Sequence, residues 1–370
     1  MKKIPVCEPL FVGNEEKYVL DCIKTGWISS SGKYIEKFET SFAKYCDVKY
    51  AVAVSNGTVA LHLSLIAAGV KQGDHVIIPN FTMIATAFAV AYIGAIPIFV
   101  DADGDTWNMN TELIEDLITD KVKAIICVSI FGTPCDMDSL IEISKKYNLI
   151  LIEDAAESHG AVYKERKIGS IADVTSFSFY SNKNLTTGEG GIVVTNDLSI
   201  YNNLKYYKNL CFSLDGRRNY IHNDIGFNYR MSNLHAAIGL AQVEKADYYK
   251  KLRIKNGLYY RQRLNNVKGL TLQKVHDYSE NVYWVNGILI NPEVFNKTRE
   301  DLINKLSQNG IDTRLFFCGM NMQPSLKRYS KFNERSFPVT KTLQENGFYL
   351  PSGSNLSKKT IDFICDIVIS

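Results

Sequence analysis

Short apolar segments alternate with amphipathic ones over the first half of the chain. The apolar runs have the length of strands, and the segments between them repeat their apolar residues at helical spacing. The predicted strands are His75–Pro79, Ile96–Asp101, Ala124–Ile130, Leu149–Glu153, Val174–Tyr180 and Gly191–Thr195. The predicted helices are Val59–Ala68, Thr82–Tyr92, Thr111–Leu117 and Asp138–Tyr147. Because such apolar strands need cover on both faces, the pattern favours an α/β fold around a mostly parallel sheet.

The pattern changes after about residue 196. Helical spacing extends over Ser232–Ala246 and continues to about Leu264. Strands such as Tyr283–Ile290 and helices such as Arg299–Asn309 follow without regular alternation. We therefore expect a large α/β domain over residues 1–248 and a smaller α+β domain over residues 249–370, which suits a chain of 370 residues.

Composition narrows the classes of function. A formal net charge of +3 and one basic stretch, Tyr248–Lys255, are typical of a solvated surface, so no nucleic-acid partner is expected. No signal peptide is recognisable, and the longest apolar run, Met83–Ile93, is too short to cross a membrane. The eight cysteines contain no CxxC pair, which argues against a metal site. We expect a cytoplasmic protein with reduced thiols and no membrane partner.

Three segments of the predicted α/β domain carry candidate chemistry. In the first, Ser55-Asn56-Gly57-Thr58 follows a short strand and opens a helix. The free N–H groups of a helix start attract anions, and the hydroxyl of Thr58 could donate to a phosphate. The alternative is a plain strand–turn–helix with a polar cap.

The second segment is EDAAESHG, at the end of a predicted buried strand. A carboxylate such as Asp154 at this position is solvated, paired or functional, and one function is to bind a protonated pyridine nitrogen. A structural cap on the following turn explains it equally well. His159 is five residues further on, where a packed, hydrogen-bonded histidine is the simpler interpretation.

The third segment places Lys183 between an aromatic strand and the glycine-rich turn TTGEGG. A lysine among apolar groups loses its charge readily, as a lysine that binds an aldehyde cofactor must. Ser178, five residues earlier, could reach the same phosphate as Thr58. The alternative is a surface lysine beside a hairpin. Together, an anion site, an acid and a sheltered lysine on one parallel sheet predict a pyridoxal 5'-phosphate site.

The segments WISSSGKYIEKFE, SNGTVALHL, DAAESHG, FSFYSNKNLTTGEGG and GFNYRMSNLHAAIGLAQ resemble the DegT/DnrJ/EryC1/StrS sugar aminotransferases, which are fold-type I enzymes. The similarity covers nearly the whole chain and is greatest with the GDP-perosamine synthase branch. It implies a homodimer with shared active sites and L-glutamate as amino donor. The site residues it implies are Lys183 as the cofactor-carrying base, Asp154 on the pyridine nitrogen, Glu157 and Met83 near the ring, Gly57, Thr58 and Ser178 on the phosphate, and Asn228 reaching the neighbouring subunit's phosphate.

Two positions depart from the family pattern. Met83 stands where relatives usually have an aromatic residue stacked on the cofactor, and Asn321 stands where histidine is common. A thioether can still cover a ring face, but both changes leave the acceptor open. The candidate substrate-side residues are Trp27, Ser29, Tyr34, His222, Arg314 and Asn321, each of which has an equally good structural explanation.

The resemblance predicts an aminotransferase acting on the C4 ketone of a nucleotide-linked 4-keto-6-deoxyhexose, for a surface polysaccharide. One alternative acceptor is a small phosphorylated ketone such as dihydroxyacetone phosphate. A non-catalytic cofactor-binding regulator is an alternative of another class, and Lys183, Asp154 and Ser178 argue against it. Related dehydratases carry histidine at the position of Lys183, so lysine favours transamination over elimination.

Overall fold

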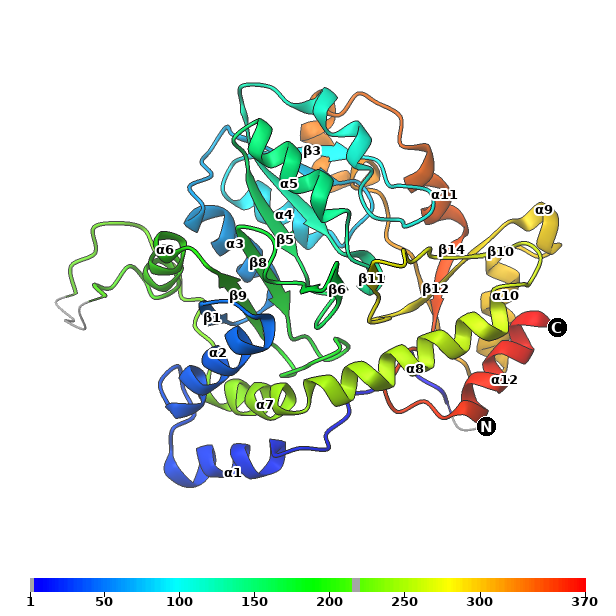
Figure 1. Cartoon of the computed structure of the whole chain (residues 1–370), viewed down its shortest axis with the longest axis horizontal. Helices are drawn as coiled ribbons and strands as arrows, with labels where there is room; N and C mark the ends of the chain where they lie inside the picture. Colours follow the sequence, from blue (N-terminus) through cyan, green and yellow to red (C-terminus); the bar gives the residue numbers. More distant parts are fainter. Residues whose placement is uncertain (1–2, 215–219) are drawn as a thin grey trace.

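A seven-stranded sheet forms the centre of the molecule (Figure 1). In the computed structural model, which describes residues 3–214 and 220–370, its order is β1-β9-β8-β5-β4-β2-β3. The strands are β1 (Tyr50–Val54), β2 (His75–Pro79), β3 (Ile96–Val100), β4 (Val122–Val128), β5 (Ile150–Asp154), β8 (Val174–Ser178) and β9 (Gly191–Thr195). Within this sheet, β9 runs antiparallel to its neighbours β1 and β8, and the remaining pairs are parallel. The prediction of a mostly parallel sheet is therefore confirmed.

Helices cover both faces of this sheet. Successive strand residues point to opposite sides, and apolar residues on both sides need cover. In β4, Ile125 and Cys127 join one apolar core, whereas Ala124 and Ile126 join the other. The helices on the first face are α1 (Glu15–Thr25), α2 (Lys33–Cys46), α5 (Met137–Lys146) and α7 (Asn233–Glu244). Those on the second face are α3 (Gly57–Ala67), α4 (Ala85–Tyr92) and α6 (Leu198–Lys208).

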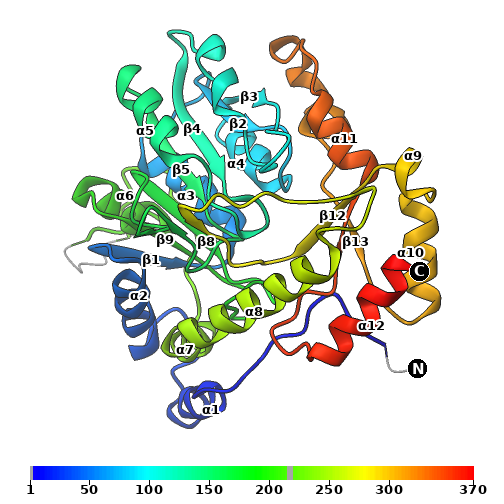
Figure 2. The ribbon, with the colours of Figure 1, turned by 45° about the vertical axis from the view of Figure 1, so that its right-hand side comes forward.

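The C-terminal part has a four-stranded antiparallel sheet of its own, in the order β10-β12-β14-β13 within the described residues. Its strands are β10 (Leu270–Leu272), β12 (Asn286–Ile290), β13 (Arg314–Leu315) and β14 (Gly347–Leu350). The helices of this part are α8 (Ala246–Leu264), α9 (Pro292–Phe295), α10 (Arg299–Gln308), α11 (Pro338–Asn346) and α12 (Lys358–Ile369). Figure 2 shows α8 running from the large sheet to the small one. The predicted boundary at residue 248 falls inside α8, and the division into two domains stays a prediction.

Short elements complete the described chain. A small sheet has the order β11-β6-β7, formed by β6 (Val162–Tyr163), β7 (Arg166–Lys167) and β11 (Ser279–Glu280). The 3₁₀ helices are η1 (Thr111–Leu113), η2 (Glu115–Leu117), η3 (Ile130–Gly132), η4 (Met320–Met322) and η5 (Pro324–Phe332). A search of the described helices finds none that combines the length and the apolarity needed to cross a membrane.

The ends of several predicted elements differ by two or three residues, as for Ala124–Ile130 against β4 and Thr82–Tyr92 against α4. Three predicted elements differ more strongly. The helix predicted over Thr111–Leu117 is two 3₁₀ turns, because so short a segment forms few α-helical hydrogen bonds. The strand predicted from Tyr283 begins at Asn286, since Tyr283 has a left-handed backbone with φ of 48°. The helix predicted to run unbroken from residue 232 to 264 is interrupted at Lys245.

Candidate active site

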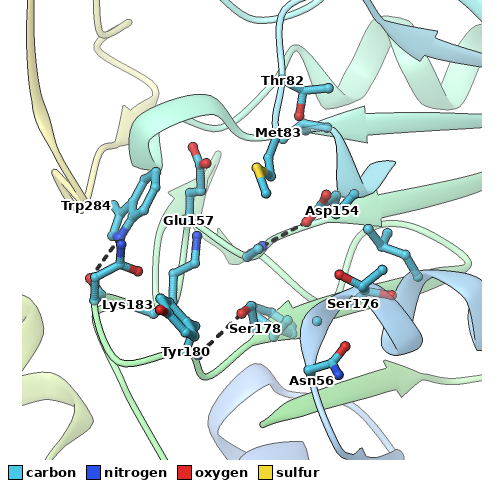
Figure 3. A pocket seen from close by; sticks show the side chains of 18 of the residues that line it. Asn56, Thr82, Met83, Asp154, Glu157, Ser176, Ser178, Tyr180, Lys183 and Trp284 are labelled. Carbon is cyan, nitrogen blue, oxygen red and sulfur yellow. Dashed lines mark hydrogen bonds between the residues drawn. The ribbon is translucent and has the colours of Figure 1, made fainter. Parts of the chain in front are cut away.

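The parallel strands of the large sheet end at one edge, and a cavity of about 560 Å³ lies there. Open α/β sheets bind ligands at this edge, and the volume is that of a small-molecule site. The lining side chains come from the start of α3, the loop after β2, the ends of β5 and β8, and the C-terminal part (Figure 3). The cavity thus collects residues from both parts of the chain.

The start of α3 forms one end of the cavity. The side chain of Asn56 caps the helix by accepting a hydrogen bond of 3.0 Å from the backbone N–H of Val59. A Cβ atom at Gly57 would lie 2.6 Å from Cβ of Ser178, so the helix start packs directly against the end of β8. The backbone N–H groups of a helix start, with the hydroxyls of Thr58 and Ser178 nearby, suit a phosphate.

Asp154 ends β5 and is buried in the cavity wall. Its carboxylate accepts hydrogen bonds from the hydroxyl of Thr86 at 3.0 Å and from the backbone N–H of Ala156 at 3.2 Å. Burial raises the pKa of this carboxyl group, and the two hydrogen bonds oppose that rise. A buried acid held only by neutral donors favours a positively charged N–H partner.

Lys183 follows β8 in a turn, closed by a hydrogen bond of 2.9 Å from its backbone N–H to the carbonyl of Tyr180. Its side chain extends into the cavity toward Glu157 (Figure 3), and its nitrogen lies 3.7 Å from the centroid of the Trp284 ring. Burial lowers the pKa of Lys183, although the charges of Glu157 and Asp154 act in the opposite direction. An amine that loses its proton easily is a nucleophile and a base.

Glu157 lies on the other side of this amine. It is buried, and its carboxylate accepts a hydrogen bond of 2.7 Å from the backbone N–H of Phe131. Burial raises the pKa of Glu157 to about 7, with Lys183 opposing the rise. The charges of Glu157 and Lys183 therefore depend on each other at neutral pH.

Seven of the eight predicted cofactor-binding residues line this cavity. They are Gly57, Thr58, Met83, Asp154, Glu157, Ser178 and Lys183. Asn228 lies elsewhere on the chain, where its side-chain oxygen accepts hydrogen bonds of 2.9 and 2.7 Å from Arg230. The role of Asn228 toward a neighbouring subunit, and the roles of the seven, stay predictions.

The six predicted substrate-side residues lie outside the lining of this chain's cavity. Asn233 bonds the backbone carbonyls of Trp27 and Ser29, each at 2.6 Å. The hydroxyl of Tyr34 donates to Asp21 at 2.9 Å. The bonds from Asn233 tie the segment before α2 to the start of α7, and the roles of Trp27, Ser29 and Tyr34 toward a substrate stay predictions.

The other three candidates also have local partners. Nδ1 of His222 lies 2.6 Å from the carbonyl oxygen of Leu210, and Arg314 donates to Asp312 at 2.6 Å. Asn321 exchanges two hydrogen bonds of 2.9 Å with the side chain of Asn80. Their predicted roles toward a substrate stay predictions.

Several lining residues were not anticipated from the sequence. The aromatic residues among them are Tyr92, Phe177, Tyr180, Trp284, Phe317 and Tyr349. Trp284 and Tyr349 belong to the C-terminal part, and both pack in the apolar core that also contains Phe131. Phe177 and Tyr180 lie within the segment FSFYSNKNLTTGEGG, whereas no motif marks Trp284 and Tyr349, which folding rather than local spacing brings to the cavity.

The cavity residues fit pyridoxal phosphate. An acid suited to a pyridine nitrogen, an amine suited to an aldehyde and a helix start suited to a phosphate line one space. Because Gly57 has no Cβ atom, the helix start packs directly on Ser178 and still lines the cavity, where a phosphate could approach its backbone N–H groups.

Comparison with known proteins gives the family. The model of the DegT/DnrJ/EryC1/StrS aminotransferase family matches residues 11–369. The chain belongs to this family. It is therefore a transaminase of the α/β, fold-type I class, as its motifs predicted, and the family implies pyridoxal phosphate as cofactor.

Similar proteins support this assignment. The chain is 43% identical to the GDP-perosamine synthase of Escherichia coli O157:H7, covering 100% of this chain and 98% of that protein. It is 40% identical to the GDP-perosamine synthase of Vibrio cholerae, covering 99% and 98% of the two chains. The solved aminotransferase of Psychrobacter cryohalolentis has a TM-score of 0.90 at 29% identity, covering 98% and 97%. A mutant GDP-4-keto-6-deoxymannose-3-dehydratase with bound GDP-perosamine has a TM-score of 0.90 at 25% identity, covering 99% and 100%.

Proposed function

We propose that this transaminase carries pyridoxal phosphate on Lys183 and moves an amino group from L-glutamate to a nucleotide-linked 4-keto-6-deoxyhexose. The amino group goes to C4 of the sugar, which then enters a surface polysaccharide. The observation that carries the proposal is the position of the Lys183 amine in a cavity that Asp154 and Glu157 also line. The choice of acceptor is supported by full-length relatives named GDP-perosamine synthase.

The residues that would hold the cofactor lie along one wall. Asp154 would bind the protonated pyridine nitrogen, and its own hydrogen bonds from Thr86 and Ala156 fix its orientation. The start of α3, with Thr58, and the hydroxyl of Ser178 would bind the phosphate. Met83 is half exposed and lines the cavity, so its thioether could cover one ring face.

When bound, the cofactor supplies an aldehyde that takes up the amino group and a ring that withdraws electrons from the reacting carbon. The amine of Lys183 removes the proton from the α-carbon of the donor, and its lowered pKa favours the neutral form that can do so. Asp154 keeps the ring nitrogen protonated. Trp284 covers the Lys183 amine on one side and excludes water there.

A lysine at position 183 favours amine transfer over elimination. Lysine can displace a product amine from the cofactor, whereas the histidine of related dehydratases cannot form that bond. A GDP-4-keto-6-deoxymannose-3-dehydratase of similar fold was solved with bound GDP-perosamine, which supports a GDP-linked sugar as the acceptor.

A homodimer and a cytoplasmic location belong to the same proposal. The six predicted substrate-side residues and Asn228 lie outside their own chain's cavity lining, which supports a site completed by a second copy.

The test is an amino-group transfer assay with isotopically labelled glutamate and GDP-4-keto-6-deoxymannose. We expect mass spectrometry to find the label in a GDP-linked amino sugar. Labelled cofactor without labelled sugar would contradict the acceptor but not the donor. Dihydroxyacetone phosphate would then be the next acceptor to examine. A deaminated product would indicate a lyase instead.

A further inference from the structure

Arg253, in the middle of α8, carries a buried positive charge. Only 2% of the residue is exposed. In the described part of the chain its hydrogen bonds go to neutral groups: Nη1 donates to the carbonyls of Trp284, at 3.1 Å, and Ser352, and Nη2 contacts Sγ of Cys7 at 3.3 Å. Its Nε is buried without a partner there. A buried charge without a counter-ion is unfavourable, so the presence of Arg253 at this position needs an explanation.

The partners of Arg253 lead to the residue before the reactive lysine. The carbonyl of Asn182 accepts a hydrogen bond of 2.9 Å from the indole nitrogen of Trp284. The thiol of Cys7 donates to the same carbonyl, at 3.5 Å. The peptide group that joins Asn182 to Lys183 is therefore held by two side chains, and Arg253 contacts both residues that supply them.

Trp284 also contacts the reacting group itself. Its ring centroid lies 3.7 Å from the Lys183 nitrogen, so a shift of the indole would change both the position and the surroundings of the amine. Arg253 fixes the backbone of Trp284 by its bond to the carbonyl group. One guanidinium thus contacts the N-terminal segment at Cys7 and, at Trp284 and Ser352, the segments next to the C-terminal sheet, and it reaches the turn that carries Lys183 through Cys7 and Trp284.

We propose that Arg253 is a positioning residue for Lys183, acting through Trp284 and Cys7 on the carbonyl of Asn182. This inference rests on the proposed function of Lys183. A purely structural role would lower the stability of the fold and leave the surroundings of the Lys183 amine in the folded protein unchanged. A positioning role changes those surroundings, and small displacements of a reacting group have large effects on rate.

The chain offers matched variants. Arg253→Met removes the charge and keeps the length of the side chain. Cys7→Val removes only the thiol link, whereas Cys7→Ser keeps a group that can donate and accept. Arg263→Met is the control, because Arg263 lies on the same helix but is bound to Asp362 and Asp366 on the surface of the C-terminal part.

The first readout is the indole N–H resonance of Trp284 in the labelled full-length protein, recorded with and without pyridoxal phosphate. Trp284→Phe assigns it among the three tryptophans. We expect it to shift in Arg253→Met and Cys7→Val and to stay in place in Cys7→Ser and Arg263→Met. The second readout is turnover, where kcat should fall about tenfold in Arg253→Met with the KM for glutamate changed less than about threefold.

An unchanged Trp284 resonance with unchanged kcat, in variants that fold, would overturn the proposal. If Arg253→Met does not fold, Cys7→Val decides by the same two readouts. If the wild-type protein shows no amino transfer at all, the proposed function fails, while the Trp284 resonance still decides whether Arg253 holds this network.

Discussion

The side-chain nitrogen of Lys183 lies 3.7 Å from the centroid of the Trp284 ring, so a residue of the C-terminal part covers an amine of the large sheet. An aromatic face favours the charged amine, by about 0.5–2 kcal/mol. Burial acts against the charge, and it lowers the pKa of Lys183 although the charges of Glu157 and Asp154 act in the opposite direction. The contact therefore shields an amine that gives up its proton readily, which is the property the proposed chemistry needs.

Replacing Lys183 tests the assignment of the base. Lys183→Ala should reduce amino transfer at least about a hundredfold, because within the described residues no other lysine lines the cavity to remove the donor's proton. Lys145→Ala, at an exposed position of α5, is the control and should react normally. Amino transfer by Lys183→Ala at the wild-type rate would show that the base is another residue.

Asp154→Asn tests the acid on the ring nitrogen. The substitution keeps the size of the side chain and removes the charge, so kcat/KM should fall about 10²- to 10³-fold. Because the phosphate contacts lie at the other end of the cavity, the protein should still bind pyridoxal phosphate, which absorbance after gel filtration measures. A variant with normal kinetics would remove this role from Asp154.

Gly57→Ala tests the end of the cavity that is proposed to bind the phosphate. The added Cβ would lie 2.6 Å from Cβ of Ser178, so either the helix start or Ser178 must move. We expect cofactor binding to weaken by about 1–3 kcal/mol, or about five- to 150-fold in Kd. Gly104→Ala, where nothing lies within 4 Å of the added atom, should bind the cofactor as the wild type does. Equal affinity in both variants would place the phosphate elsewhere.

Glu153 predicts a pH dependence of stability. This residue is fully buried in β5, and burial raises the pKa of its carboxyl from 4.5 to about 7. The folded state therefore binds more protons than the unfolded state between pH 4.5 and 7, and stability should fall as pH rises through that window, by roughly 3 kcal/mol. Urea unfolding of the cofactor-free protein at several pH values measures the fall.

Glu153→Gln removes the titrating group and should flatten that part of the pH profile. Its amide oxygen can still accept the hydrogen bond that Ser129 donates to Glu153 at 3.0 Å. Glu142→Gln, at an exposed position on α5, should leave the profile as it is. A profile for Glu153→Gln that keeps the wild-type slope would assign the pH dependence to other groups.

The sheet was predictable because its strands are short apolar runs with clear ends. His75–Pro79 and Gly191–Thr195 have the predicted bounds, and the carboxyl end of β5 puts Asp154 at the edge where ligands bind. The strand predicted from Tyr283 was wrong at its start for a local reason. Tyr283 has a left-handed backbone, which shortens the strand. Apolar spacing does not encode such a conformation.

The site was predictable as far as its residues belong to motifs. Asp154 and Ser178 end strands, and Gly57 and Lys183 lie in the segments that come after strands, so the sheet brings all four to the cavity. Trp284 reaches the same cavity from the C-terminal part, through contacts made only when the two sheets pack together. Residues that a second subunit would contribute to the site are still harder to predict from local sequence. Asn228 is the predicted example.

The most direct test of the proposed amino transfer to a nucleotide-linked sugar is a half-reaction followed by absorbance. The protein is loaded with pyridoxal phosphate, converted to the amino form of the cofactor with L-glutamate, freed of keto acid and mixed with GDP-4-keto-6-deoxymannose. We predict that the absorbance of the aldehyde form returns as the sugar takes the amino group. A protein that reacts with glutamate but never recovers that absorbance with this sugar, or with other nucleotide-linked keto sugars, would contradict the proposed acceptor.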